Sequence, residues 1–259
     1  MALPVGGGIG GLVLLLLFSA LTGTNPIDLI NTQQEPSSTG TTGVRDDDPQ
    51  AQFVSVVLRD TEDTWSEIFQ RRGEAYQPPK LVLFTQATQT GCGVGQAVMG
   101  PFYCPADRDV YLDLSFFREL DQRFGAPGDF AQAYVVAHEV GHHIQTLTGL
   151  SDRVGAARQR GGERQANALS VRQELQADCY AGVWGHYAAQ RGLLEPGDAD
   201  EGLRAAAAIG DDTLQRQTQG RVAPESFTHG SSEQRVRWLR TGLDSGNVDS
   251  CNTFANGTQ

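Results

Sequence analysis

The chain has 259 residues, of which 39% are hydrophobic and 20% are charged, so it is long enough to bury a sizeable core and is not disordered throughout. Its formal net charge of -11 and its one lysine, Lys80, argue against a nucleic-acid partner, because binding a phosphate backbone needs clustered basic side chains.

An apolar segment comes first in the sequence. Leu3 to Leu21 contains no charged residue, and its length suits a membrane helix, which needs roughly 17–25 apolar residues. We expect residues 1–24 to be an uncleaved single-pass anchor that holds an extracytoplasmic domain at the cell membrane. A cleaved signal peptide, which would make the protein secreted, is the nearest alternative, although no basic region precedes the apolar stretch. A buried core helix fits less well, because a polar segment follows directly.

Residues 25–50 are rich in Ser, Thr, Gly, Gln and Asp and are predicted to form a flexible polar linker. The folded domain is therefore expected to span residues 51–255. Apolar residues recur at helical spacing from 50 to 71, which predicts a packing helix. Two β-rich runs, KLVLFTQ (80–86) and DVYLDLSFF (109–117), predict two strands of a small sheet.

Four cysteines favour two disulfides in a domain that lies beyond a membrane anchor. Of the three connectivities, Cys92 with Cys104 and Cys179 with Cys251 is preferred, because the first pair closes a short loop. Four reduced core cysteines are the alternative. A zinc-binding cysteine cluster is less favoured, since the sequence has no C-x-x-C pair.

Four further segments predict helices, over 130–148, 163–190, 198–217 and 231–242. Asp129 is the expected N-cap of the first, and Gly149 lies just past its end. Ser231 and Gln234 form a capping-box pair for the last, with Gly242 as its stop. The predicted fold class is α+β, mainly helical with a small β-sheet.

The first of these helices contains the sequence HEVGHH. His138 and His142 are one helical turn apart, so their imidazoles project toward a common point, and Glu139 can flank that point without being a ligand. This H-E-x-x-H arrangement is typical of metallohydrolases. Gly141 removes a side chain where substrate or a neighbouring helix can approach. Two core histidines satisfied by hydrogen bonds are the alternative.

Catalytic zinc takes three protein ligands and keeps a fourth position open. Glu174 on the next long helix is the expected third ligand, with His143 and His186 as alternatives. Asp178, one turn further on, is expected to accept the outer N–H of a ligand histidine and so fix its orientation. A solvated helix face is the other interpretation of Glu174 and Asp178.

Five segments occur in order between Ala51 and Phe254: GPFYCPADRDVYLDLSFF, HEVGHHIQ, ELQADCYAGVW, AAAAIGDD and FTHGSSEQRVRW. Together they resemble the bacterial membrane-anchored neutral zinc metallopeptidase family, and the HExxH and ExxxD pair also resembles the gluzincin group that includes thermolysin. The resemblance implies a zincin-like fold with an HExxH active-site helix, a second ligand helix and a hydrolase site with one Zn2+ per chain. The Asn-Ala strand motif of thermolysin-like enzymes is not evident, and VYLDLSFF (110–117) is the candidate for the edge strand that aligns substrate.

The expected chemistry follows from charge. Zinc held by His138, His142 and Glu174 keeps a net positive charge, which lowers the pKa of its water to about 7 and polarises a peptide carbonyl. Glu139 is expected to act as general base, taking the proton of that water and returning it to the leaving amine. His229, just before the last helix, is the candidate donor to the oxyanion, with an ordinary loop histidine as the alternative.

Asp211 and Asp212 follow the AAAAIG run. They could orient a metal-binding residue through a hydrogen bond or bind calcium themselves, but a charge pair at a helix end is the preferred interpretation. Taken together, these residues predict a membrane-tethered, extracytoplasmic zinc endopeptidase of the gluzincin type that acts on proteins or peptides.

Three other functions compete with this prediction. A catalytically limited zinc-binding protein with a protease fold could act as an envelope assembly or binding factor, but the intact Glu139 speaks against it, because a binding module needs no general base there. A structural zinc protein lacks its fourth protein ligand. An aminopeptidase would need an acidic group for the substrate amine, and no exopeptidase loop is recognisable. The oligomeric state is not predicted.

Overall fold

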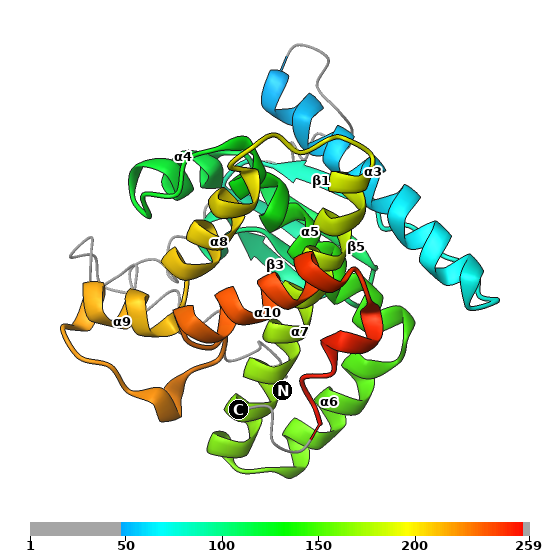
Figure 1. Cartoon of the computed structure of the whole chain (residues 1–259). Coiled ribbons are helices and arrows are strands. Elements are labelled where there is room, and N and C mark those ends of the chain that lie inside the picture. The colour runs from blue at the N-terminus through cyan, green and yellow to red at the C-terminus, as the bar shows by residue number, and fades with distance from the viewer. Residues whose placement is uncertain (1–47, 256–259) are drawn as a thin grey trace.

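The computed structural model describes residues 48–255; the predicted anchor and most of the predicted linker lie outside the described residues. This part of the chain is α+β and mainly helical, as expected (Figure 1). Its helices are α3 (Pro49–Arg71), α4 (Ser115–Gln122), α5 (Asp129–Leu147), α6 (Leu150–Arg160), α7 (Glu163–Gln190), α8 (Asp198–Ala208), α9 (Asp211–Gln219) and α10 (Ser232–Ser245). Its strands are β1 (Leu81–Phe84), β2 (Ala87–Thr90), β3 (Gly93–Gln96), β4 (Phe102–Cys104) and β5 (Asp109–Asp113), and the short 3-10 turns are η1 (Ala97–Met99), η2 (Pro224–Ser226) and η3 (Val248–Cys251).

The first helix begins slightly earlier than predicted. Asp48 caps α3 by accepting hydrogen bonds from the N–H groups of Gln50 and Ala51, and Pro49 occupies the first helical position. The last two residues of the predicted linker therefore belong to the folded domain. Within residues 48–255, no helix has both the length and the apolar character needed to cross a bilayer.

The main sheet has three strands in the order β1-β5-β4. β5 pairs in parallel with β1, where Leu81 lies opposite Val110, and antiparallel with β4, where Phe102 lies opposite Tyr111. Because β5 is in the middle, both of its sides are occupied. The expectation that residues 110–117 supply a free, substrate-aligning edge is therefore wrong; in the described part of the chain, the edge strands of this sheet are β1 and β4.

The predicted strand over 109–117 also ends early, at Asp113. One carboxylate oxygen of Asp113 accepts a hydrogen bond from the N–H of Ser115 at 2.8 Å, and the other accepts one from the N–H of Gln86 at 3.1 Å. The side chain thus satisfies a free donor at the start of α4 and holds the turn after β1. Phe117 lies on α4 as a result, where it is buried in the core.

α5 occupies the centre of the fold and contacts α3, α6, α7, α8 and the sheet (Figure 1). Apolar residues on nearly every side of the helix, such as Val136 and Ile144, explain this burial. Its N-cap is Gly128, and Asp129 is the first helical residue rather than the predicted cap. Gly149 has a left-handed φ of 68° just past the helix end, as predicted.

The long helix predicted over 163–190 is α7, with these same ends, whereas the segment 198–217 is split into α8 and α9. The capping box before α10 is present, but α10 continues to Ser245, and Gly246 rather than Gly242 ends it. Gly242 instead faces Gly182 of α7, and a Cβ on either glycine would overlap the backbone of the other helix. The two glycines therefore let α7 and α10 cross in direct backbone contact.

Both predicted disulfides are confirmed. Cys92–Cys104 joins the β2–β3 hairpin to the end of β4, and Cys179–Cys251 joins α7 to η3. The second bridge is fully buried, since neither of its residues has measurable exposure. It connects the helix that carries the predicted third ligand to the segment that follows α10.

Candidate metal centre

The two helices that carry the predicted ligands approach each other closely at Gly141. A Cβ on this residue would lie 2.9 Å from both the Cα and the carbonyl oxygen of Ala177, so glycine is required for this spacing. Gly141 sits between His138 and His142 on α5, and Ala177 follows Glu174 by three residues on α7. The close approach of the backbones therefore brings the two halves of the site together.

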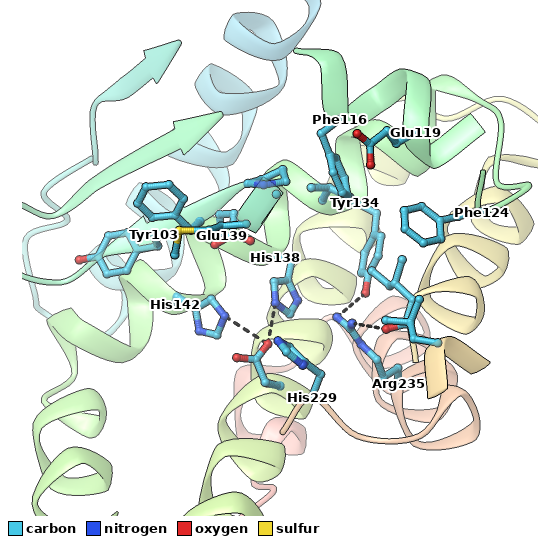
Figure 2. A pocket seen from close by; sticks show the side chains of 18 of the residues that line it. Tyr103, Phe116, Glu119, Phe124, Tyr134, His138, Glu139, His142, His229 and Arg235 are labelled. Atoms are coloured by element: carbon cyan, nitrogen blue, oxygen red, sulfur yellow. Dashed lines mark hydrogen bonds and ion pairs between the residues drawn. The ribbon is translucent and has the colours of Figure 1, made fainter. Parts of the chain in front are cut away.

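Three side chains of the kind that bind zinc meet at this point (Figure 2). Nε2 of His138 lies 3.1 Å from Oε2 of Glu174, and Nε2 of His142 lies 3.5 Å from the same oxygen. One donor atom from each residue lies within 4.8 Å of the other two. Two imidazoles and one carboxylate are a donor set of catalytic zinc, so the residues present fit this metal.

Asp178 lies behind His138, as predicted. Its Oδ1 accepts a hydrogen bond from Nδ1 of His138 at 2.8 Å, which turns Nε2 toward Glu174. Two residues that the sequence reasoning missed hold this carboxylate. The guanidinium of Arg235 donates to both of its oxygens at 2.9 and 2.8 Å, and the hydroxyl of Tyr134 donates to Oδ1 at 2.6 Å.

A buried glutamine plays the matching part behind His142. Nδ1 of His142 lies 2.9 Å from Oε1 of Gln145, and Nε2 of Gln145 donates to Oε1 of Gln176 at 3.1 Å. Gln176 in turn donates to the carbonyl oxygen of Cys251 at 3.0 Å. This chain of amides, Gln145 to Gln176 to Cys251, links a proposed zinc ligand to the buried disulfide, and only the spacing of Gln145 three residues after His142 could have indicated it.

The charges of the cluster compensate one another inside the protein. Burial by itself would raise the pKa of Asp178, but the charges of Arg235 and His138 bring it down to about 2. Burial also opposes ionisation of Glu174, yet His142 and His138 hold its pKa well below the usual range. Burial lowers the pKa of His138, but Asp178 and Glu174 together raise it to about 10 overall. Both carboxylates are therefore ionised at neutral pH.

The histidines considered as alternative ligands lie elsewhere. Nε2 of His143 is 2.6 Å from the carbonyl oxygen of Gln77, and its Nδ1 is 3.1 Å from the hydroxyl of Tyr103. Burial lowers the pKa of His143. His186 bonds through Nδ1 to the carbonyl oxygen of Leu243 at 2.7 Å. Neither residue belongs to the cluster of donor atoms around Glu174.

His229 reaches the same cavity from the segment between α9 and α10 (Figure 2). One oxygen of Asp211 accepts hydrogen bonds from the backbone N–H groups of Thr228, His229 and Gly230, at 2.7, 2.7 and 3.1 Å. The other oxygen lies 3.2 Å from Nδ1 of His229. Burial lowers the pKa of this histidine, but Asp211 and Glu174 raise it overall.

Asp211 and Asp212 do lie in the first turn of α9, as the preferred interpretation requires, but that position is only part of their role. Asp211 fixes the conformation of the His229 segment. Asp212 accepts hydrogen bonds from the backbone N–H and the hydroxyl of Ser232, at 2.7 and 2.9 Å, and so anchors the start of α10.

A cavity of about 370 Å³ opens over the cluster, a size that suits a small ligand or a few side chains of a peptide. Glu139, which is buried, lines it beside the two histidines that are predicted ligands. β4 contributes Phe102 and Tyr103 to one wall. The remaining walls are mainly apolar. They come from η1 and the turn after it, from α4 and the turn after it, from the end of α8 and from α9, and include Met99, Phe116, Phe124, Ile209 and Leu214.

An HExxH helix, a carboxylate on a second helix and a cavity with a free strand edge form the kind of centre that zinc metallopeptidases use. The comparison with protein families agrees, because the family described as "Putative neutral zinc metallopeptidase" matches residues 1–254. The chain belongs to this family. The family description indicates zinc as the metal and a peptide or protein as the substrate.

Relatives occur in distant bacteria. The uncharacterized protein YpfJ of Escherichia coli K12 is 52% identical over 250 residues, which cover 95% of this chain and 87% of the relative. The uncharacterized protein Rv2575 of Mycobacterium tuberculosis H37Rv is 47% identical over 191 residues, covering 70% of this chain and 64% of the relative. No solved structure matches the chain.

Proposed function

We propose that the protein is a zinc endopeptidase of the gluzincin type with a zincin-like fold. In this proposal His138, His142 and Glu174 hold the metal, and Glu139 is the general base. The observation that carries it is the convergence of the three donor atoms within 4.8 Å on the floor of a cavity that Glu139 also lines.

Bound at this site, zinc would supply a Lewis acid that polarises the substrate carbonyl and makes the attacking water more acidic. The carboxylate of Glu139 accepts the proton of that water and passes it to the nitrogen of the leaving amine. His229 donates an N–H group to the carbonyl oxygen as negative charge develops there. Asp211 keeps this imidazole oriented through its contact with Nδ1.

The residues behind the ligands keep the site in one geometry. Asp178 and Gln145 each hold the Nδ1–H of one ligand histidine, so both Nε2 atoms face the same point. Arg235 and Tyr134 fix Asp178 in turn, and Arg235 balances its charge. Orientation of this kind is set before substrate arrives.

β4 takes over the role that was expected of residues 110–117. Its outer edge is unpaired in the described part of the chain, and Phe102 and Tyr103 place it at the cavity wall. An extended substrate can pair with such an edge through main-chain hydrogen bonds. The disulfide Cys92–Cys104 ends this strand and holds it against the β2–β3 hairpin.

We also propose that the domain lies outside the cytoplasm and is tethered by residues 1–24. Two disulfides with no free cysteine in residues 48–255 support an oxidising compartment. Membrane fractionation of the full chain, with protease protection of the intact cells, tests both points. A chain found in the soluble cytoplasmic fraction would contradict them.

Replacing the general base tests the chemistry. Glu139→Gln should keep its zinc and fold but lose about 10²–10⁴-fold in kcat, because an amide cannot accept the proton of the attacking water. Hydrolysis of a fluorescence-quenched unfolded protein and metal analysis measure the two effects. Glu119→Gln is the matched control, since this exposed carboxylate lines the same cavity from α4 without approaching the ligand cluster. Full activity in Glu139→Gln would rule out Glu139 as the general base, whereas zinc binding without hydrolysis by the wild-type protein would favour a zinc-binding assembly factor.

A further inference from the structure

A second cavity, of about 740 Å³, lies between the N-terminal half of α7 and the start of α10. It is separated from the metal centre by one stretch of chain, residues 227–231. Phe227 and Ser231 line this second cavity, whereas His229 between them lines the first. The two cavities therefore share this segment as a common wall.

The floor of the second cavity supports the His229 segment directly. A Cβ on Gly230 would lie 3.2 Å from Leu175 and 3.3 Å from Val171, so the backbone of the segment rests on these two side chains. Both residues line the second cavity. Glu174, next to Leu175 on α7, lines the first.

Three arginines line the second cavity, Arg164 and Arg172 from α7 and Arg237 from α10. Among residues 48–255, none of the three forms an ion pair with a carboxylate, although Glu225 and Glu233 line the same cavity. The chain has a net charge of -11, so acidic residues outnumber basic ones, yet no carboxylate of residues 48–255 pairs with these three guanidinium groups. Guanidinium groups in a recess bind carboxylate and phosphate groups strongly.

The rest of the lining favours a polypeptide over a membrane surface. Ala168, Val171, Leu175 and Phe227 form an apolar floor that suits side chains. A uniformly anionic lipid surface would be repelled by Glu225 and Glu233, whereas a peptide with both acidic and apolar side chains can avoid them. The concave shape also fits a chain segment better than a flat bilayer.

We infer that this cavity, lined by Arg164, Arg172 and Arg237, is an exosite for an acidic segment of the substrate protein. This inference rests on the proposed peptidase function. The occupant is assigned to the substrate because the 227–231 segment is a common wall of the two cavities, so one polypeptide can engage both. Once one part of the substrate is bound in the first cavity, binding of its acidic segment in the second becomes intramolecular. The effective concentration of that segment is therefore raised.

Binding is tested on the full chain carrying Glu139→Gln, which prevents cleavage. A labelled peptide of alternating Glu and Leu should bind at least about 10-fold more tightly than a matched peptide of alternating Lys and Leu, with the difference shrinking as salt is added. The double change Arg164→Ala with Arg237→Ala should abolish this preference. Arg240→Ala, an exposed position on the same helix outside the cavity lining, is the matched control and should retain it.

Turnover separates this inference from the proposed function. Wild-type protein should cleave a peptide joined to the acidic segment with a kcat/KM about 10-fold higher than the same peptide alone, and the double arginine change should bring that ratio close to one. If both substrates are cleaved and the ratio is unaffected, the exosite is wrong and the peptidase stands. If neither is cleaved but arginine-dependent peptide binding persists, the binding site stands and the proposed function fails. Arginine-dependent binding to phosphatidylglycerol vesicles, without binding to the peptide, would overturn the assignment in favour of a lipid surface.

Discussion

The residues of the candidate metal centre are held in two different ways. His138, His142 and Glu174 project from two buried helices whose backbones touch at Gly141, so the helices themselves determine their spacing. His229 lies on the segment between α9 and α10. The carboxylate of Asp211 positions this segment by accepting hydrogen bonds from three of its backbone N–H groups. The predicted ligands on the helices are thus fixed mainly by packing, whereas the conformation of the His229 segment depends mainly on hydrogen bonds to one polar side chain of α9.

This difference predicts that zinc binding and catalysis can be separated. Changes on α5 and α7 should remove the metal, and changes around Asp211 should slow the reaction of a protein that still holds its metal. Each of the following measurements tests one side of the comparison.

The largest effect is expected from Glu174→Ala. Removing a direct ligand should lower zinc affinity by more than about 100-fold, because partners that only orient a ligand already contribute about 10–100-fold. Competition with a zinc chelator measures the affinity. His186→Gln, on the same helix but outside the cluster, is the control. If His186→Gln lost zinc while Glu174→Ala kept it fully, Glu174 would not be the third ligand.

Gln145→Leu should have the next largest effect. The change keeps a side chain of similar size but removes the acceptor for Nδ1 of His142, so zinc affinity should fall about 10–100-fold. Asp178→Asn should act similarly on His138. Unaltered affinity in Gln145→Leu would mean that this hydrogen bond does not orient the ligand.

Gly141→Ala tests the close approach of the helices. The added methyl meets the backbone of Ala177, which cannot move aside cheaply, so we expect a loss of about 1–3 kcal/mol in the free energy of unfolding. Gly155→Ala in α6 is the matched control, because a Cβ there meets no atom within 4 Å and should instead stabilise the protein by about 0.5–1 kcal/mol. Denaturant unfolding of both variants would show the opposite signs, and equal effects would contradict the argument.

The smallest effect is expected from Asp211→Asn. An amide still accepts hydrogen bonds but carries no charge, so the segment should loosen and kcat/KM should fall about 10-fold while the zinc content stays constant. Asp212→Asn, the neighbouring residue that holds Ser232 instead, controls for general damage to α9. Loss of zinc from Asp211→Asn would show that the two sides of the site are not independent.

The sequence predicted best what depends on local spacing. The ends of α7, the left-handed Gly149 after α5 and the pair of histidines one turn apart all follow from helical periodicity and capping. The strand that ends at Asp113 is predicted too long, because apolar residues continue past Asp113 and Ser115 into α4. The prediction that Gly242 ends a helix is wrong, because a glycine needed for close contact between helices cannot be told in sequence from one that ends a helix.

Local sequence patterns do not predict contacts between residues that are far apart in the chain. Arg235 reaches Asp178 across 57 positions and Asp211 reaches Thr228 across 17, and neither pair leaves a trace in local pattern. β2 and β3 have only 4 residues each and β4 has 3, so they carry too little alternation to be recognised as strands.

The chain of amides from His142 to Cys251 also has a consequence for biosynthesis. Cys251, the last residue in this chain of amides, lies 72 positions after Cys179. The ribosome must therefore have synthesised these residues before the hydrogen bonds behind His142 are complete. Until then the two histidines exist on a helix without their final support. The order of translation therefore delays completion of the centre until after α10 has emerged.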